Sequence, residues 1–177
     1  MAERYIPDPV LPVGAVMVTP DISLHSVMKI MEEYFGAGVV HSKGFPVRDF
    51  TDYYAREMGK ETVKYFYYVE SLFPLEGAET WKTWSNGLEK EFRNSAGVNR
   101  PVNMDPGYLT QAKLVLFSMK GYAHRIYIRD GVYGEVTLQY KAGAFHSLPW
   151  TYSDYQTPMA LKFWKKAREK LRQLVTD

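Results

Sequence analysis

Four short segments combine tyrosines with carboxylates or basic residues, and these residue types could form a ligand site. They are TDYYAREMG (Thr51 to Gly59), DPGY (Asp105 to Tyr108), HRIY (His124 to Tyr127) and WTYSDY (Trp150 to Tyr155). Tyrosine can stack on a ligand, arginine can bind an anion through parallel hydrogen bonds, and histidine or a carboxylate can act as a general acid or base. We therefore predict that the segments meet in a polar-aromatic pocket, whose candidate ligand-binding residues are Asp52, Tyr54, Glu57, Asp105, His124, Arg125, Glu135, Tyr152 and Asp154.

The clearest local pattern is HRIYIRDGVYGEVTLQY, two alternating runs joined by Asp130-Gly131. An Asp-Gly pair between such runs is typical of a two-residue β-hairpin turn. If the two strands pair without interruption from this turn, Ile126 lies opposite Glu135, and His124 is a diagonal neighbour of Glu135 on the same face. This pairing places Arg125 on the other face. A His–Glu pair could transfer a proton or supply two metal ligands, although a polar pair that merely stabilises the hairpin is the commoner arrangement.

The segment Asp105-Pro106-Gly107 has two structural interpretations. It suits a type II turn, and it also suits the start of a helix with Asp105 as N-cap and Pro106 in the first position. Apolar residues at helical spacing from Leu109 to Met119 favour a helix after it. The exposed amides beyond Gly107 could then hold an anion, although most helix N-termini hold none.

Metal and nucleotide motifs are missing from the sequence. There are no cysteines, and the four histidines show no HxH, HxxxH or HExxH spacing, so no metal ligand is assigned. A metal site would need carboxylates from distant segments, for which Asp52, Glu57, Asp105, Glu135 and Asp154 are available. The segment MGKET (Met58 to Thr62) resembles only the tail of a phosphate-binding P-loop, and no GxSxG motif occurs. The sequence therefore identifies no cofactor.

Composition indicates one soluble domain over residues 1–177. The chain is 46% hydrophobic and 24% charged, with a formal net charge of +2. That charge is too small to favour a nucleic-acid partner, although the last 21 residues contain six Lys or Arg and two Asp or Glu. No apolar run is long enough to cross a membrane and no signal-peptide pattern is seen, so we expect a cytoplasmic protein without a membrane partner.

Periodicity predicts an α+β fold. Helices are expected over residues 21–36, 78–92, 109–119 and 158–174, and strands over residues 13–18, 38–42, 62–70, 124–140 (as the hairpin) and 144–149. This order predicts a mixed or mostly antiparallel sheet with helices chiefly on one face. Its first half is compatible with a ferredoxin-like split β-α-β unit.

Four segments together resemble an uncharacterised bacterial and archaeal family, a domain of unknown function. They are FTDYYAREMG, VNMDPGYL, HRIYIRDGVYGEVTLQY and LPWTYSDY, and the resemblance runs from Val13 to the final helix. Some members are loosely labelled GTP-binding proteins, but the resemblance implies no assigned chemistry. A proline often stands in that family where this chain has Ser153, so the last loop is expected to be less rigid here.

Three functional hypotheses follow. In the first, the pocket binds a small anionic ligand, phosphorylated or nucleotide-like. Arg125 would clamp the anion, and His124 or a carboxylate would act as acid or base if the protein is an enzyme. In the second, the chain is a non-catalytic homo-oligomeric interaction domain whose aromatic loops form an interface. RNA binding through the basic final helix comes third.

Overall fold

The continuous apolar run near the N-terminus forms the central strand β1 (Leu11–Val18), which is buried along its whole length. Its side chains alternate between two cores. Val16 and Val18 belong to the core beneath the helices α1 and α3, whereas Val13 and Ala15 belong to the core beneath α4. A strand covered on both faces has no need of polar alternation, and this explains why the run is apolar throughout.

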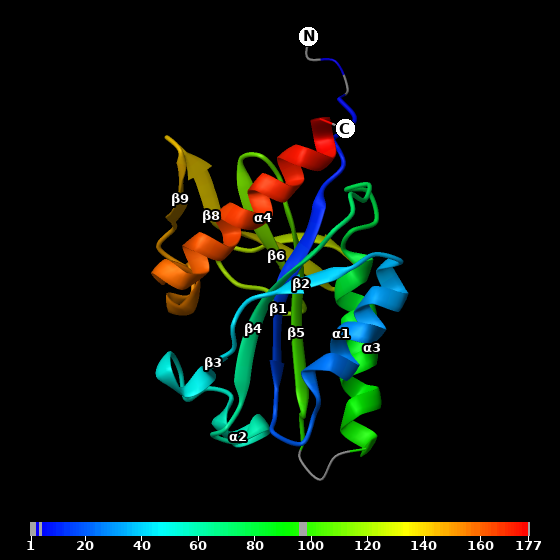
Figure 1. The fold of residues 1–177 in the computed structure, drawn as a ribbon, viewed down its shortest axis with the longest axis vertical. Helices are drawn as coiled ribbons and strands as arrows, with labels where there is room; N and C mark the ends of the chain where they lie inside the picture. The colour runs from blue at the N-terminus through cyan, green and yellow to red at the C-terminus, as the bar shows by residue number, and fades with distance from the viewer. Residues whose placement is uncertain (1–2, 4, 96–98, 177) are drawn as a thin grey trace.

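The structure is a computed structural model that describes residues 3, 5–95 and 99–176 (Figure 1). All strands join one antiparallel sheet in the order β2-β4-β1-β5-β6-β8-β7, with β3 also paired to β4 and β9 to β8. The other strands are β2 (Val39–His41), β3 (Phe45–Pro46), β4 (Val63–Val69), β5 (Val102–Leu109), β6 (Lys113–Ser118), β7 (Ile126–Arg129), β8 (Val132–Lys141) and β9 (Ala144–Ser147). The helices are α1 (Leu24–Phe35), α2 (Ala55–Met58), α3 (Thr80–Ser95) and α4 (Pro158–Thr176), with short 3₁₀ turns η1 (Val47–Asp49) and η2 (Ser153–Gln156).

The first half has ferredoxin-like connectivity, as predicted. Strands β2, β4, β1 and β5 lie side by side, and each neighbouring pair is antiparallel. Helix α1 connects β1 to β2, helix α3 connects β4 to β5, and both helices pack on the same core. The prediction of an α+β fold with a mostly antiparallel sheet is confirmed. Helices α1 and α3 share one face, while α4 covers the opposite face near β8 and β9 (Figure 1).

The predicted helix over residues 109–119 is wrong, because this segment forms the turn and second strand of the β5–β6 hairpin. The run Lys113–Ser118 contains four consecutive buried apolar residues. Such a run is compatible with a buried helix as well as with a strand buried between two layers, so the sequence pattern alone does not distinguish them. Asp105-Pro106-Gly107 is therefore neither a turn nor a helix start. It lies inside β5, opposite Ala15, Gly14 and Val13 of β1.

Half of β5 has no strand on its outer side, and helix α3 takes that place. Strand β6 pairs only with Gly107–Leu109, and β5 continues beyond this point at the edge of the sheet. The ammonium of Lys82 donates to the carbonyl oxygen of Met104 at 2.6 Å, and a carboxylate oxygen of Glu89 accepts from the Met104 amide at 2.8 Å. Two side chains of α3 thus satisfy backbone groups that a neighbouring strand would otherwise pair.

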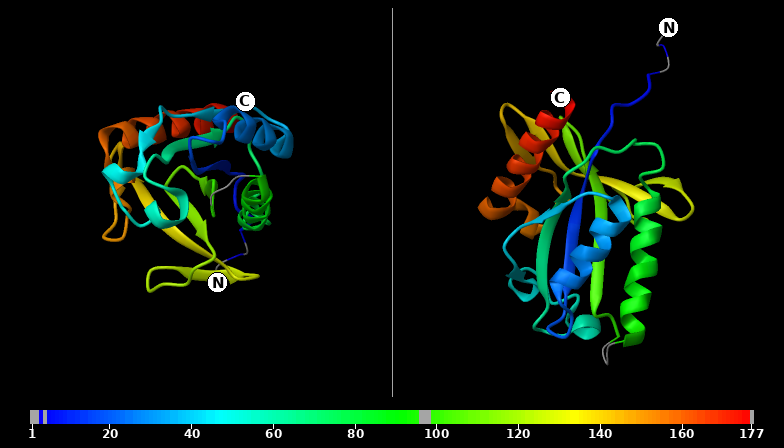
Figure 2. Two further views of the ribbon diagram at one scale, coloured as in Figure 1. Left: turned by 90° about the horizontal axis from the view of Figure 1, so that it is seen from below. Right: turned by 45° about the vertical axis from the view of Figure 1, so that its right-hand side comes forward.

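The Asp130-Gly131 hairpin is confirmed, with positive φ at both turn residues and Arg129 opposite Val132. Figure 2 shows this hairpin, in yellow, reaching out from the sheet. The predicted register is wrong further along, because an irregularity between Tyr127 and Arg129 places Ile126 opposite Gly134 instead of Glu135. An extra residue in one strand shifts every later pairing by one position.

Candidate functional site

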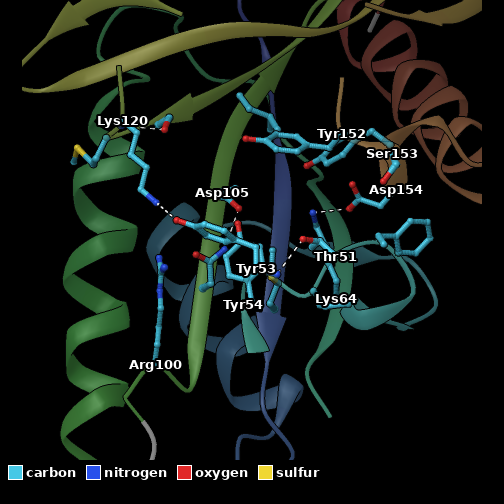
Figure 3. A pocket seen from close by; sticks show the side chains of 18 of the residues that line it. Thr51, Tyr53, Tyr54, Lys64, Arg100, Asp105, Lys120, Tyr152, Ser153 and Asp154 are labelled. Atoms are coloured by element: carbon cyan, nitrogen blue, oxygen red, sulfur yellow. Dashed lines mark hydrogen bonds and ion pairs between the residues drawn. The ribbon is translucent and has the colours of Figure 1, made fainter. Parts of the chain in front are cut away.

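A pocket of about 630 Å³ opens on the sheet face that carries α4, between the η1–α2 segment and the η2 turn (Figure 3). Its walls come from segments far apart in the chain, and all four polar-aromatic segments contribute to it. Five of the nine predicted residues line it: Tyr54, Asp105, Arg125, Tyr152 and Asp154. The structure therefore brings together the larger part of the predicted set.

The other four predicted residues do not line this pocket. Asp52 is exposed on the loop before α2. Glu57 lies outside this pocket, and its carboxylate is 3.5 Å from the guanidinium of Arg100, which lines it. His124 and Glu135 lie behind the wall and contact each other.

Glu135 organises the wall behind Arg125. It is 3% exposed, and one of its carboxylate oxygens accepts from His124 Nε2 at 2.9 Å and from Arg125 Nε at 2.6 Å. The predicted His124–Glu135 pair thus forms, although the predicted register of β7 against β8 was wrong. His124 precedes β7 and reaches Glu135 from the connecting loop. The prediction that Arg125 points to the other face is wrong, because Arg125 binds the same carboxylate.

The guanidinium of Arg125 is already heavily used. Besides Glu135, it donates to the carbonyl oxygen of Lys120 at 2.9 Å and to the Tyr152 hydroxyl at 2.8 Å. A guanidinium has five N–H groups, so at most two remain for a ligand. Arg125 chiefly fixes the β6–β7 loop and Tyr152 in position around the pocket.

A buried ion pair forms one wall of the pocket. The ammonium of Lys64 on β4 lies 2.6 Å from a carboxylate oxygen of Asp154 on η2, and the two side chains are 9% and 8% exposed. The same ammonium lies 5.0 Å from the ring centre of Tyr155, a cation–π distance. Asp154 is thus committed to a protein cation, as Figure 3 shows.

Asp105 sits at the centre of a second charged group. Its carboxylate lies 3.4 Å from the ammonium of Lys82 and accepts from the Asn103 amide at 3.0 Å. Burial alone would raise its pKa, but the charges of Lys82 and Lys64 and the Asn103 hydrogen bond hold the pKa below the ordinary value. Asp105 is therefore ionised at neutral pH and acts as an acceptor.

The pocket tyrosines are neutral donors at neutral pH. Burial, and then the charge of Asp105, raise the pKa of Tyr54 above its ordinary value. Burial and the charge of Glu135 do the same for the pKa of Tyr152, against the opposing charge of Arg125. Both hydroxyls can donate to an acceptor on a ligand.

Basic residues outnumber acidic ones in the pocket lining, and sequence reasoning missed most of them. Two carboxylates line it, whereas five cations do: Lys64, Lys82, Arg100, Lys120 and Arg125. Lys120 donates to the Tyr53 hydroxyl at 2.9 Å and has no carboxylate partner among the described residues. The one available signal was Lys64, a lone charge in the otherwise apolar-aromatic run VKYFYYV.

Metal and membrane features are not found in the described part of the chain. Its His, Asp and Glu side chains form no group of three or more that could hold a metal ion. Within the same residues, no helix is long and apolar enough to cross a membrane.

Together the fold and the pocket define a single-domain α+β protein with a ferredoxin-like half and a cation-rich pocket beside its open β5 edge. Residues 8–171 match the family described as a domain of unknown function (DUF4416). The chain belongs to this family, which confirms the predicted membership of an uncharacterised family. Searches of curated proteins and of solved structures found no match.

Proposed function

We propose that this protein binds a small anionic ligand in the pocket between η1–α2 and η2. The observation that carries the proposal is Lys120, which lines the pocket and has no carboxylate partner among the described residues, whereas the other four lining cations are each paired with a carboxylate. A concave site with converging positive charge attracts anions, and each charge-assisted hydrogen bond contributes about 1.5–3 kcal/mol. The tyrosines and the lining Phe45 and Phe50 suit an apolar or aromatic part of the same ligand.

Lys120 is the best residue for a test of this proposal. It lines the pocket, and its charge is not balanced by a carboxylate of the described chain, so its removal breaks no ion pair there. Asp154 and Lys64 are poor choices, because loss of either partner leaves a buried charge. Lys165 is a matched control, since it is exposed on α4 and away from the pocket lining.

The experiment is a thermal-shift and calorimetric comparison of charged and uncharged partners: inorganic phosphate, phenyl phosphate and adenosine monophosphate against phenol and adenosine. A ligand at a hundred times its Kd stabilises the fold by about 2.7 kcal/mol. We expect at least one phosphorylated probe to bind and its uncharged partner not to bind. Lys120→Gln should weaken binding about tenfold or more, and Lys165→Gln should leave it unchanged. Absence of binding by every anion, or equal binding of the uncharged partners, would contradict the proposal.

We also propose a second function, self-association, on the strength of the edge strand β7. Ile126, Tyr127 and Ile128 are 75%, 58% and 42% exposed, and β7 ends the sheet. An exposed apolar edge strand is a ready template for pairing with another chain. Light scattering at rising concentration should show oligomers in the wild type and fewer in Ile126→Lys. A wild type that stays monomeric at high concentration would exclude this function.

A further inference from the structure

A second cavity lies directly beside the proposed ligand site. It has a volume of about 420 Å³, and its lining includes Lys90 and Arg93 of α3 as well as the carboxylates Glu57 and Glu89, both of which contact Arg100. Two residues, Asn86 and Arg100, line both this cavity and the main pocket. The two spaces are therefore adjacent, with Asn86 and Arg100 in the walls of both, and together they are called the groove below.

One side of α3 runs the length of this groove. Lys82, Asn86, Lys90 and Arg93 are spaced by four, four and three residues, which places them on one face of the helix. Lys82 and Asn86 line the main pocket, whereas Asn86, Lys90 and Arg93 line the second cavity. With a rise of about 1.5 Å per residue, the stripe from Lys82 to Arg93 is roughly 16 Å long.

Positive charge is balanced in the middle of the groove and unbalanced at its ends. Arg100 donates two hydrogen bonds to one oxygen of Glu89, at 2.7 and 3.1 Å, and also lies near Glu57. Lys90 and Arg93 form no ion pair within the described residues. At the other end, Lys120 is bound by a tyrosine hydroxyl and not by a carboxylate.

We infer that the groove takes an elongated ligand with an anionic group at each end, one near Lys120 in the main pocket and the other near Lys90 and Arg93. The inference rests on the proposed anion-binding function and specifies the shape of its ligand. A single compact anion would leave the charges of the second cavity unused. A neutral spacer suits the middle, because Arg100 is neutralised there and Asn86 is uncharged.

Three phosphonates test this inference by calorimetry. Octane-1,8-diyl bisphosphonate carries two anionic groups at a distance, methylenebisphosphonate carries the same two groups close together, and octylphosphonate carries one. We expect the long bisphosphonate to bind about tenfold or more tighter than either of the others, since a second anion–cation contact contributes about 1.5 kcal/mol or more. The double variant Lys90→Gln/Arg93→Gln should remove this advantage and leave the affinity for octylphosphonate unchanged.

The control is Lys165→Gln/Lys166→Gln, which removes the same charge from an exposed part of α4. It should preserve the advantage of the long bisphosphonate. Binding of octylphosphonate with no advantage for the long bisphosphonate would overturn this inference and leave the proposed function standing. An advantage that persists in Lys90→Gln/Arg93→Gln would also overturn it. Failure of all three phosphonates to bind would overturn this inference, and the proposed function would fall with it only if inorganic phosphate, phenyl phosphate and adenosine monophosphate also fail to bind.

Discussion

Replacing Asp154 with asparagine should destabilise the fold far more than breaking an ion pair on the surface. The Lys64–Asp154 pair is short, at 2.6 Å, and both side chains are less than a tenth exposed. Loss of one partner from a buried pair leaves an uncompensated charge and typically costs about 3–5 kcal/mol. Urea unfolding followed by tryptophan fluorescence should report this loss as a lower midpoint, because Trp164 stacks on Tyr155 beside the pair.

A matched control separates burial from pairing itself. Arg48 and Glu61 lie 3.0 Å apart, but their side chains are 55% and 70% exposed. Glu61→Gln should therefore cost less than about 1 kcal/mol. The double variant Lys64→Met/Asp154→Leu should be more stable than Asp154→Asn, because it leaves no unpaired charge. If Asp154→Asn costs no more than Glu61→Gln, solvent reaches the pair and the reasoning fails.

Two further predictions concern β5 and its partner helix. Gly107→Ala should destabilise the fold by about 3 kcal/mol or more, because its Cβ would lie 2.0 Å from the carbonyl oxygen of Val115. Gly87→Ala, on the exposed side of α3 where a Cβ meets nothing, should stabilise by about 0.5–1 kcal/mol; equal urea midpoints for the two variants would refute the distinction. Because the pKa of Asp105 is lower in the folded than in the unfolded chain, its carboxylate stabilises the fold above about pH 4 and this contribution is lost as pH falls further. Asp105→Asn should thus lower the Tm at pH 7 and make the loss of Tm in acid shallower, and an unchanged acid slope would count against this.

The central strand, the long helices and the Asp130-Gly131 turn could be predicted because each carries its own local pattern. The site was predicted only in part, because its charges depend on contacts between distant segments. Lys82 lines the pocket because α3 covers the unpaired edge of β5. The spacing of residues in the sequence of α3 gives no information about that edge. The contact between His124 and Glu135 was predicted from an uninterrupted pairing of the two hairpin strands. The irregularity in β7 shifts that pairing, but the contact still forms.

The segment Asp105-Pro106-Gly107, for which the sequence suggested a turn or a helix start, also determines where the pocket forms. Pro106 has no N–H group, and Gly107 allows the backbone of β6 to approach closely, so β6 joins β5 at Gly107 and pairs with it only from there onward. The half of β5 before this point is left with a free outer edge. Helix α3 closes that edge with Lys82, whose ammonium also meets the carboxylate of Asp105 inside the pocket. Pro106 and Gly107 thus mark where the pairing of β5 with β6 ends. The strand edge that remains unpaired is the place where Lys82 of α3 enters the pocket.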